Sequence, residues 1–188
     1  MRVVGETDIP LAVDVETFKR SVHLGPNDTE DDLLLTTYLG AAQAVVETAI
    51  RRPLSRRQVM FSVPLSASRC WWFPVAPVSG IDAVQIRQSG GDWQAVDIAQ
   101  AELWCALDEP RLGFRSGALA GASEIRVTAT VGHDGDAPKQ AVQAIILMVQ
   151  EWWRAGISVE GDLLEAKMSF GAAQLIRQVR YLRPLEGF

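Results

Sequence analysis

The sequence predicts an α+β fold, in which a helical bundle carries an inserted antiparallel β module and an extended C-terminal tail. Apolar residues recur every three or four positions before residue 53 and again after residue 138, which is helical spacing. Between these stretches, short apolar or alternating runs are separated by Gly and Pro, as in strands and turns. The bundle is expected to contain a short helix, a long N-terminal helix and a central C-terminal helix. The predicted division is an N-terminal arm (1–13), the helical part (14–56), the β module (57–133), the core helix that completes the helical part (134–156) and the tail (157–188).

Two helices are predicted in the N-terminal part from their ends and their periodicity. Asp14 can cap a short helix whose apolar face carries Val15, Phe18 and Val22. The second helix follows the acidic segment 28–32, whose charge favours a helix N-terminus, and it ends before Pro53. Its predicted buried stripe consists of Leu34, Tyr38, Ala41, Ala42, Val45 and Ala49.

The β module is predicted from a change of period. In the segment 124–131, charged residues and threonines alternate with apolar residues, which predicts a strand with one buried face. The sequence Ser89-Gly90-Gly91-Asp92 is a hairpin turn signal, because both glycines can adopt positive φ. The other strand candidates are residues 58–63, 69–73, 81–86, 93–98, 102–107 and 111–114.

The C-terminal part begins with a predicted core helix between Pro138 and Gly156, which suit a helix start and a helix end. This helix is apolar over a wide arc, so it is expected at the centre of the bundle. In the tail, the apolar residues Leu175, Ile176, Val179 and Leu182 have the spacing of one helix face. Arg177, Arg180 and Arg183 lie three apart, which places them along one face if this segment is helical.

Composition and charge exclude several function classes. The 188-residue chain has a formal net charge of −5, which is poorly suited to gripping nucleic-acid phosphates and better suited to a surface past which DNA slides. No signal peptide is visible, and the apolar run 144–149 is far below the ~18 residues of a membrane span, so we expect cytoplasmic synthesis and no membrane contact. Cys70 and Cys105 are too few for a disulfide framework or a zinc site, and we expect both to be reduced.

No motif in the chain predicts catalysis or a cofactor. The sequence contains no phosphate loop, no G-x-S-x-G elbow and no Cys-x-x-Cys pair. The segment His133-Asp134-Gly135-Asp136 has residue types that bind metals, but turn chemistry alone explains its Asp and Gly residues. We therefore expect neither an enzyme nor a metal site.

Aromatic residues and tail arginines are the better candidates for a functional surface. Trp71 and Trp72 are neighbours on a predicted strand, so one of them should face away from the core and serve an interface, unless both pack within the domain. The tail arginines can form a solvated face, a nucleic-acid patch or an anchor to an acidic partner. The anchor is favoured because apolar residues interleave them. The predicted anchor comprises Leu175, Ile176, Arg177, Val179, Arg180, Tyr181, Leu182 and Arg183.

The ordered set of elements resembles the head–tail connector (adaptor) family of long-tailed phages, in the version found in phage-like gene transfer agents. The resemblance covers about residues 11–155, and the tail after Gly156 is longer than in many relatives. The segments that carry it are Asp14–Lys19, Asp28–Asp32, Val46–Leu54, Phe73–Ile81, Val127–His133, Pro138–Ala141 and Glu151–Trp153.

The resemblance implies a structural role. Twelve copies would form a ring under the portal protein, extend the DNA channel without sequence-specific binding, and join the capsid vertex to a stopper or tail-terminator protein. The tail would bind the portal, and the protein would be made in the bacterial cytoplasm and built into the particle at the head–tail junction. The alternative is a small peptide- or carbohydrate-binding domain, which would need Trp71, Trp72, Trp93 and Trp104 on one open face.

Overall fold

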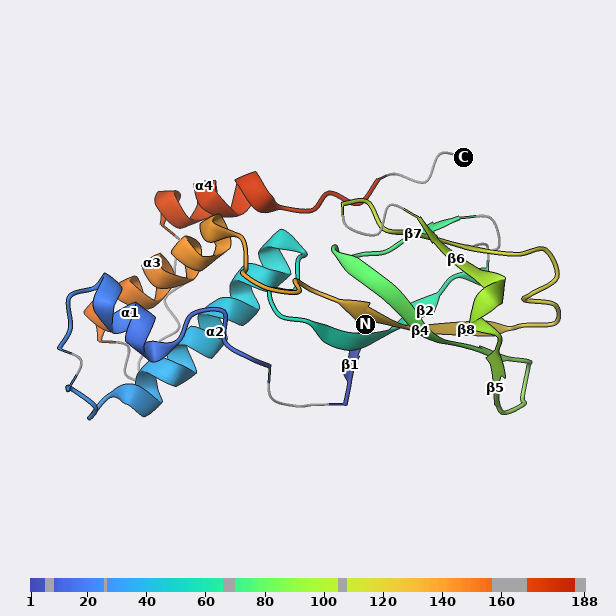
Figure 1. Ribbon diagram of the computed structural model, residues 1–188, viewed down its shortest axis with the longest axis horizontal. Coiled ribbons are helices and arrows are strands. Elements are labelled where there is room, and N and C mark those ends of the chain that lie inside the picture. The colour runs from blue at the N-terminus through green and yellow to red at the C-terminus, as the bar shows by residue number, and fades with distance from the viewer. Residues whose placement is uncertain (6–8, 26, 66–69, 105–107, 157–168, 185–188) are drawn as a thin grey trace. The chain divides into compact units, whose positions relative to one another are not determined.

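The computed structural model describes residues 1–5, 9–25, 27–65, 70–104, 108–156 and 169–184 (Figure 1). The chain divides into two compact units. The β unit comprises Met1–Ile9, Arg51–Asp134 and Tyr181–Phe188, and the helical unit comprises Pro10–Ile50 and Gly135–Arg180. The β unit is thus an insertion between the second and third helices, and the described part of the tail is divided between both units.

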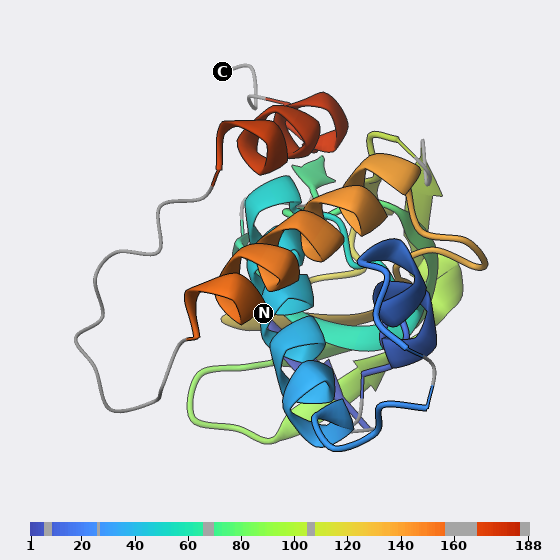
Figure 2. The same cartoon turned by 90° about the vertical axis from the view of Figure 1, so that its left-hand side faces the viewer.

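The helical unit contains α1 (Val15–Ser21), α2 (Asp32–Ile50), α3 (Lys139–Ala155) and α4 (Phe170–Val179). Asp14 caps α1 as predicted, because its carboxylate accepts the Thr17 backbone N–H at 2.6 Å. Pro138 precedes α3, and Gly156 ends it in the left-handed conformation with φ of 58°. The helix α3 contacts both α2 and α4, which confirms its predicted central place in the bundle (Figure 2).

The buried stripe predicted for α2 is wrong by about one residue. The buried side chains are Leu35, Leu39, Ala42, Gln43, Val46 and Ile50. Leu34 and Val45, which were expected inside, are each 41% exposed. Because α2 is apolar nearly all round, its periodicity fits two adjacent stripes, and packing against the other helices decides between them.

One buried polar residue of α2 fixes residues 10–12 of the predicted arm. The Gln43 side chain accepts the Ala12 N–H at 2.7 Å and donates to the Pro10 carbonyl at 3.1 Å. This arrangement satisfies a buried amide and ties the start of the helical unit to its longest helix. Among the described helices, α2 alone is long and apolar enough to cross a membrane by length and composition, although one side of it is packed inside the helical unit.

The β unit consists of two antiparallel sheets. One has the strand order β1-β2-β8-β4-β5 and the other β3-β7-β6. The strands are β1 (Arg2–Val4), β2 (Arg57–Val63), β3 (Trp71–Trp72), β4 (Val78–Arg87), β5 (Trp93–Val96), β6 (Ala101–Trp104), β7 (Arg111–Phe114) and β8 (Glu124–Val131), with a 3-10 turn η2 (Ile98–Gln100) between β5 and β6. The alternating strand β8 lies between β2 and β4, and the predicted hairpin joins β4 to β5. The start of the predicted arm forms β1, an edge strand that pairs with β2.

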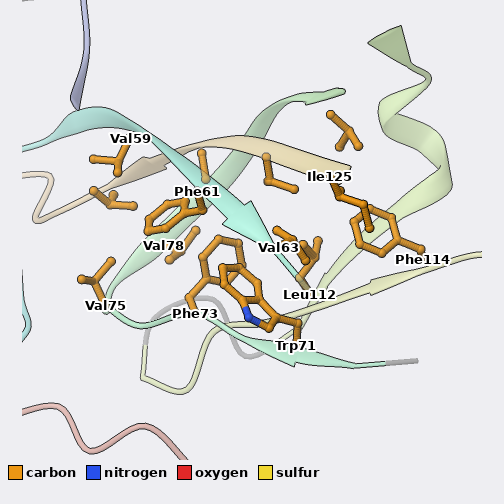
Figure 3. Packing of buried hydrophobic residues seen from close by; sticks show 14 of the residues in the cluster. Val59, Phe61, Val63, Trp71, Phe73, Val75, Val78, Leu112, Phe114 and Ile125 are labelled. Atoms are coloured by element: carbon orange, nitrogen blue, oxygen red, sulfur yellow. The ribbon is translucent and has the colours of Figure 1, made fainter. Parts of the chain in front are cut away.

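Both sheets contribute to the core of the β unit (Figure 3). Phe61 from β2, Trp71 from β3 and the following residue Phe73 form an aromatic cluster with ring centroids 4.9–6.0 Å apart. Edge-to-face and tilted contacts of this kind stabilise a core beyond the burial of area alone. The aromatic cluster therefore fixes β3, which has only two residues, against the larger sheet.

Candidate functional site

The residues whose types bind metals do not gather into a metal-binding cluster in the described part of the chain. No set of three or more His, Cys, Asp or Glu side chains lies close enough to hold a metal ion within the described part of the chain. His133 is half-buried, and burial together with the Arg52 charge lowers its pKa. The neighbouring Asp134 forms an ion pair with Arg56 at 2.7 Å. Cys70 is a free thiol, whereas Cys105 lies outside the described residues.

Two of the surface hollows are large enough to consider as binding sites. The larger, of about 560 Å³, lies beside Phe114. Among its described lining residues only Arg115 is charged, and the Arg115 guanidinium pairs with the Glu102 carboxylate at 3.4 Å. The smaller, of about 250 Å³, is lined by Glu16, Lys19, Arg20 and Leu24. The Lys19 ammonium donates to the Asp28 carbonyl and pairs with the Asp32 carboxylate, so it already has partners within the helical unit.

Trp71 and Trp72 point in opposite directions, as neighbours on a strand must. Trp71 is 5% exposed and packs in the β-unit core, whereas Trp72 lies on the other face of its sheet and is half-buried. On that face Trp72 is opposite Arg111 in the register of β3 and β7, and Arg111 is opposite Trp104 in the register of β7 and β6. The three side chains therefore form one row across the sheet.

We call this row, Trp72, Arg111 and Trp104, the Trp–Arg–Trp row. The guanidinium carbon of Arg111 lies 5.4 Å from the Trp72 ring centroid and 4.8 Å from that of Trp104. Cation–π attraction to both rings orients three large side chains on one face. Sequence reasoning identified Trp72 as an interface candidate, named Trp104 only for the alternative binding domain, and missed Arg111. Only the strand pairing brings residues 72, 104 and 111 together.

The tryptophans of the β unit do not lie on one open face. Trp71 is in the core, and Trp93 belongs to the other sheet. The ring centroid of Trp93 lies 3.8 Å from the guanidinium carbon of Arg126 and 5.0 Å from that of Arg87. The alternative of a peptide- or carbohydrate-binding domain required Trp71, Trp72, Trp93 and Trp104 on one open face, and the described residues do not have that arrangement.

The predicted anchor residues of the tail fall into three groups. Ile176 is buried in the helical unit and Tyr181 in the β unit, so both serve their own units. The Tyr181 hydroxyl donates to the Phe73 carbonyl at 3.1 Å, and burial raises the pKa of this phenol. Exposed positions are Arg177, Arg180 and Leu182, and partly exposed ones are Leu175, Val179 and Arg183.

Comparison with known proteins gives a match at the level of structure. No family model matches the chain, and no curated protein matches it in sequence. A chain in a structure of the neck of a native gene transfer agent (GTA) particle, computed with C12 symmetry, matches with a TM-score of 0.73 and 22% identity. The alignment covers 100% of this chain and 99% of that chain. This chain has the fold of a GTA neck protein.

Two further solved structures support the same assignment of fold. A chain in the neck of an empty GTA particle, computed with C6 symmetry, matches with a TM-score of 0.73 and 23% identity. A chain in the virion of a native GTA particle matches with a TM-score of 0.74 and 24% identity. Both alignments cover 100% of this chain and 99% of the other, which confirms the predicted α+β fold and agrees with the connector resemblance found in the sequence.

Proposed function

We propose that this protein is a structural head–tail adaptor subunit. Twelve copies form a ring under the portal, extend the DNA channel, and join the capsid vertex to a stopper or tail-terminator protein. The observation that carries this proposal is the end-to-end fold match with chains of GTA necks, one of them computed with C12 symmetry. The work of such a subunit is the mutual burial of surface in a closed ring and requires no chemical step.

The charge of the chain supports a conduit for DNA. Twelve copies of a chain with net charge −5 give the ring a large negative net charge. DNA phosphates are repelled by a negatively charged assembly, so the duplex passes without being held. The protein is made in the cytoplasm and becomes part of the particle at the head–tail junction.

The tail supplies the contact with the portal in this proposal. Arg177 and Arg180 are exposed near the C-terminal end of α4, and Leu182 is 71% exposed. Arginines beside exposed apolar atoms suit a protein interface, because the guanidinium can pair with carboxylates while its stem packs on apolar surface. The Trp–Arg–Trp row offers a second contact surface on the β unit, since Trp and Arg are the residue types that dominate interface energies.

The test uses the full chain and a purified portal ring. We expect electron microscopy of the mixture to show a twelve-copy ring of this protein on the portal. The double variant Arg177→Glu/Arg180→Glu should bind at least about tenfold more weakly, because it reverses the charge of the proposed anchor. Arg154→Glu, at an exposed position in the last turn of α3, is the matched control and should bind normally.

Point variants are preferable to deletion of the tail. A chain ending at residue 156 would lose buried Ile176 and Tyr181, so its failure to bind could reflect a damaged fold. Absence of any complex with the unaltered chain would refute the adaptor proposal. Normal binding of the double arginine variant would refute only the anchor.

A further inference from the structure

The exposed side of α2 carries no charged residue. The exposed positions of this 19-residue helix are Leu33, Leu34, Thr36, Thr37, Ala41, Ala44, Val45 and Thr48, which we call the α2 outer face. Leu33 is 83% exposed, and Leu34 and Val45 are each 41% exposed. A helix that faces water normally carries charged residues on its outer side. Of the two carboxylates of α2, Asp32 pairs with Lys19 at the start of the helix. Glu47 is half-buried and accepts a hydrogen bond from Gln43, and it is the one charge of the helix that borders this face.

The α2 outer face can be covered without leaving a polar group unpaired. Its three threonine hydroxyls donate to carbonyls one turn back, at 2.8 Å for Thr36, 3.0 Å for Thr37 and 2.8 Å for Thr48. A donor that already has a partner inside its own helix loses little when water is removed. Ala41 and Ala44 are small enough to let another element approach closely. The face therefore has the properties of an interface.

We propose that the α2 outer face is the contact by which one subunit packs against the next copy of this chain in the ring. This inference rests on the adaptor function proposed above. Each subunit of a closed ring has two neighbours, and its interface joins two different surfaces, so the α2 outer face meets another surface of the next subunit. Twelve acidic chains repel one another, and this repulsion opposes contact least where the exposed positions carry no charge, as on the α2 outer face.

The lack of basic residues along the α2 outer face favours a protein partner over a lipid surface. Helices that lie on membranes have Lys and Arg along their polar edges, which attract anionic lipids. Here exposed Glu30 and Asp31 precede the helix, no exposed Lys or Arg lies within Asp32–Ile50, and exposed Arg51 follows it. The acidic N-terminal flank would be repelled by such lipids, and no basic residue lies along the length of the face to attract them.

The first experiment places charge on the α2 outer face. We expect Ala41→Glu/Val45→Glu to reduce the occupancy of the ring on the portal at least about tenfold, because a buried, unpaired carboxylate opposes association. Ile98→Glu is the matched control, because Ile98 is 44% exposed on the β unit, close to the 41% of Val45. Ring occupancy equal to that of the unaltered chain in the double variant, or the same loss in the control, would overturn the proposal.

The second experiment does not depend on the folding of a charged variant. A photoreactive phenylalanine analogue at Val45 should crosslink the chain to another copy of itself, and only in mixtures with the portal ring. Crosslinking to the portal alone, or none in an assembled ring, would refute the contact. Flotation of the unaltered chain with anionic phosphatidylserine vesicles, abolished by Val45→Glu, would show a lipid partner and overturn the proposal. If the unaltered chain forms no ring, the proposed adaptor function is refuted. If it forms a ring without a contact at the α2 outer face, only the proposed contact is refuted.

Discussion

Gly132 should be among the least replaceable residues of the β unit. It follows β8 with φ of +99°, and its N–H donates to the Pro77 carbonyl at 3.1 Å. A Cβ at this position would lie 2.2 Å from the Ser55 carbonyl oxygen and 2.7 Å from its carbonyl carbon. Both obstacles are backbone atoms, so no side-chain rotation can relieve the overlap.

The cost of Gly132→Ala has two parts. Positive φ costs a residue with a Cβ about 1–2 kcal/mol. In addition, the Ser55 carbonyl must retreat by about 0.8 Å before the contact reaches even 3.0 Å, below which Cβ contacts essentially never occur. Ser55 lies just before β2, and Arg57 pairs with Val131, so this movement opens the end of the β2–β8 pair. We expect a total loss of about 4 kcal/mol or more in the free energy of unfolding of the β unit.

The matched control is Gly117→Ala. Gly117 lies in the same unit with φ of +86°, and no atom lies within 4 Å of the place that a Cβ would occupy, so this variant carries the backbone strain without the overlap. The free energy of unfolding of both variants is measured in urea, with hydrogen exchange at the β8 amides as the probe, so that both values report on the same structural unit. Equal losses for Gly132→Ala and Gly117→Ala would refute the close approach of residues 55 and 132.

Three further predictions concern single side chains. Tyr181→Phe should cost about 1 kcal/mol in urea unfolding, because it leaves the Phe73 carbonyl without its donor; no change would mean that this hydrogen bond contributes nothing. Burial and Arg52 hold the pKa of His133 below 6.5, so the unfolded chain binds the proton more readily and stability should fall as pH drops through 6.5 toward the lowered pKa. His133→Gln should flatten this slope between pH 7.5 and pH 5 in thermal melts, and identical slopes would contradict the assignment. Asp14→Ala should cost about 1 kcal/mol at pH 7, and Asp14→Asn less, because the amide can still cap α1. The hydrogen bonds that lower the pKa of Asp14 stabilise the fold above pH 3.8 and are lost as acid protonates the carboxylate, so Asp14→Asn should be less sensitive to acid than the unaltered chain in circular dichroism.

The sequence by itself determined the elements whose signals are local. The Asp14 cap, the helix limits at Pro138 and Gly156, the Gly90-Gly91 hairpin and the alternation in 124–131 each act over a few residues. A cap or a turn is stabilised by its own neighbours in the chain, so these predictions did not depend on what lies across the molecule. The fold class followed from the order in which these elements occur.

Only the tertiary structure decided which faces are buried and which side chains meet. The apolar character of α2 on nearly all sides left its buried stripe undetermined, and packing placed Leu35 inside and Leu34 outside. The Trp–Arg–Trp row depends on the pairing of three strands. The buried Tyr181 hydroxyl donates its hydrogen bond to the Phe73 carbonyl, which lies 108 positions earlier in the chain. Such contacts arise from long-range packing, in which many pairings compete for the same apolar surface, so no short window of sequence contains the information that selects one of them.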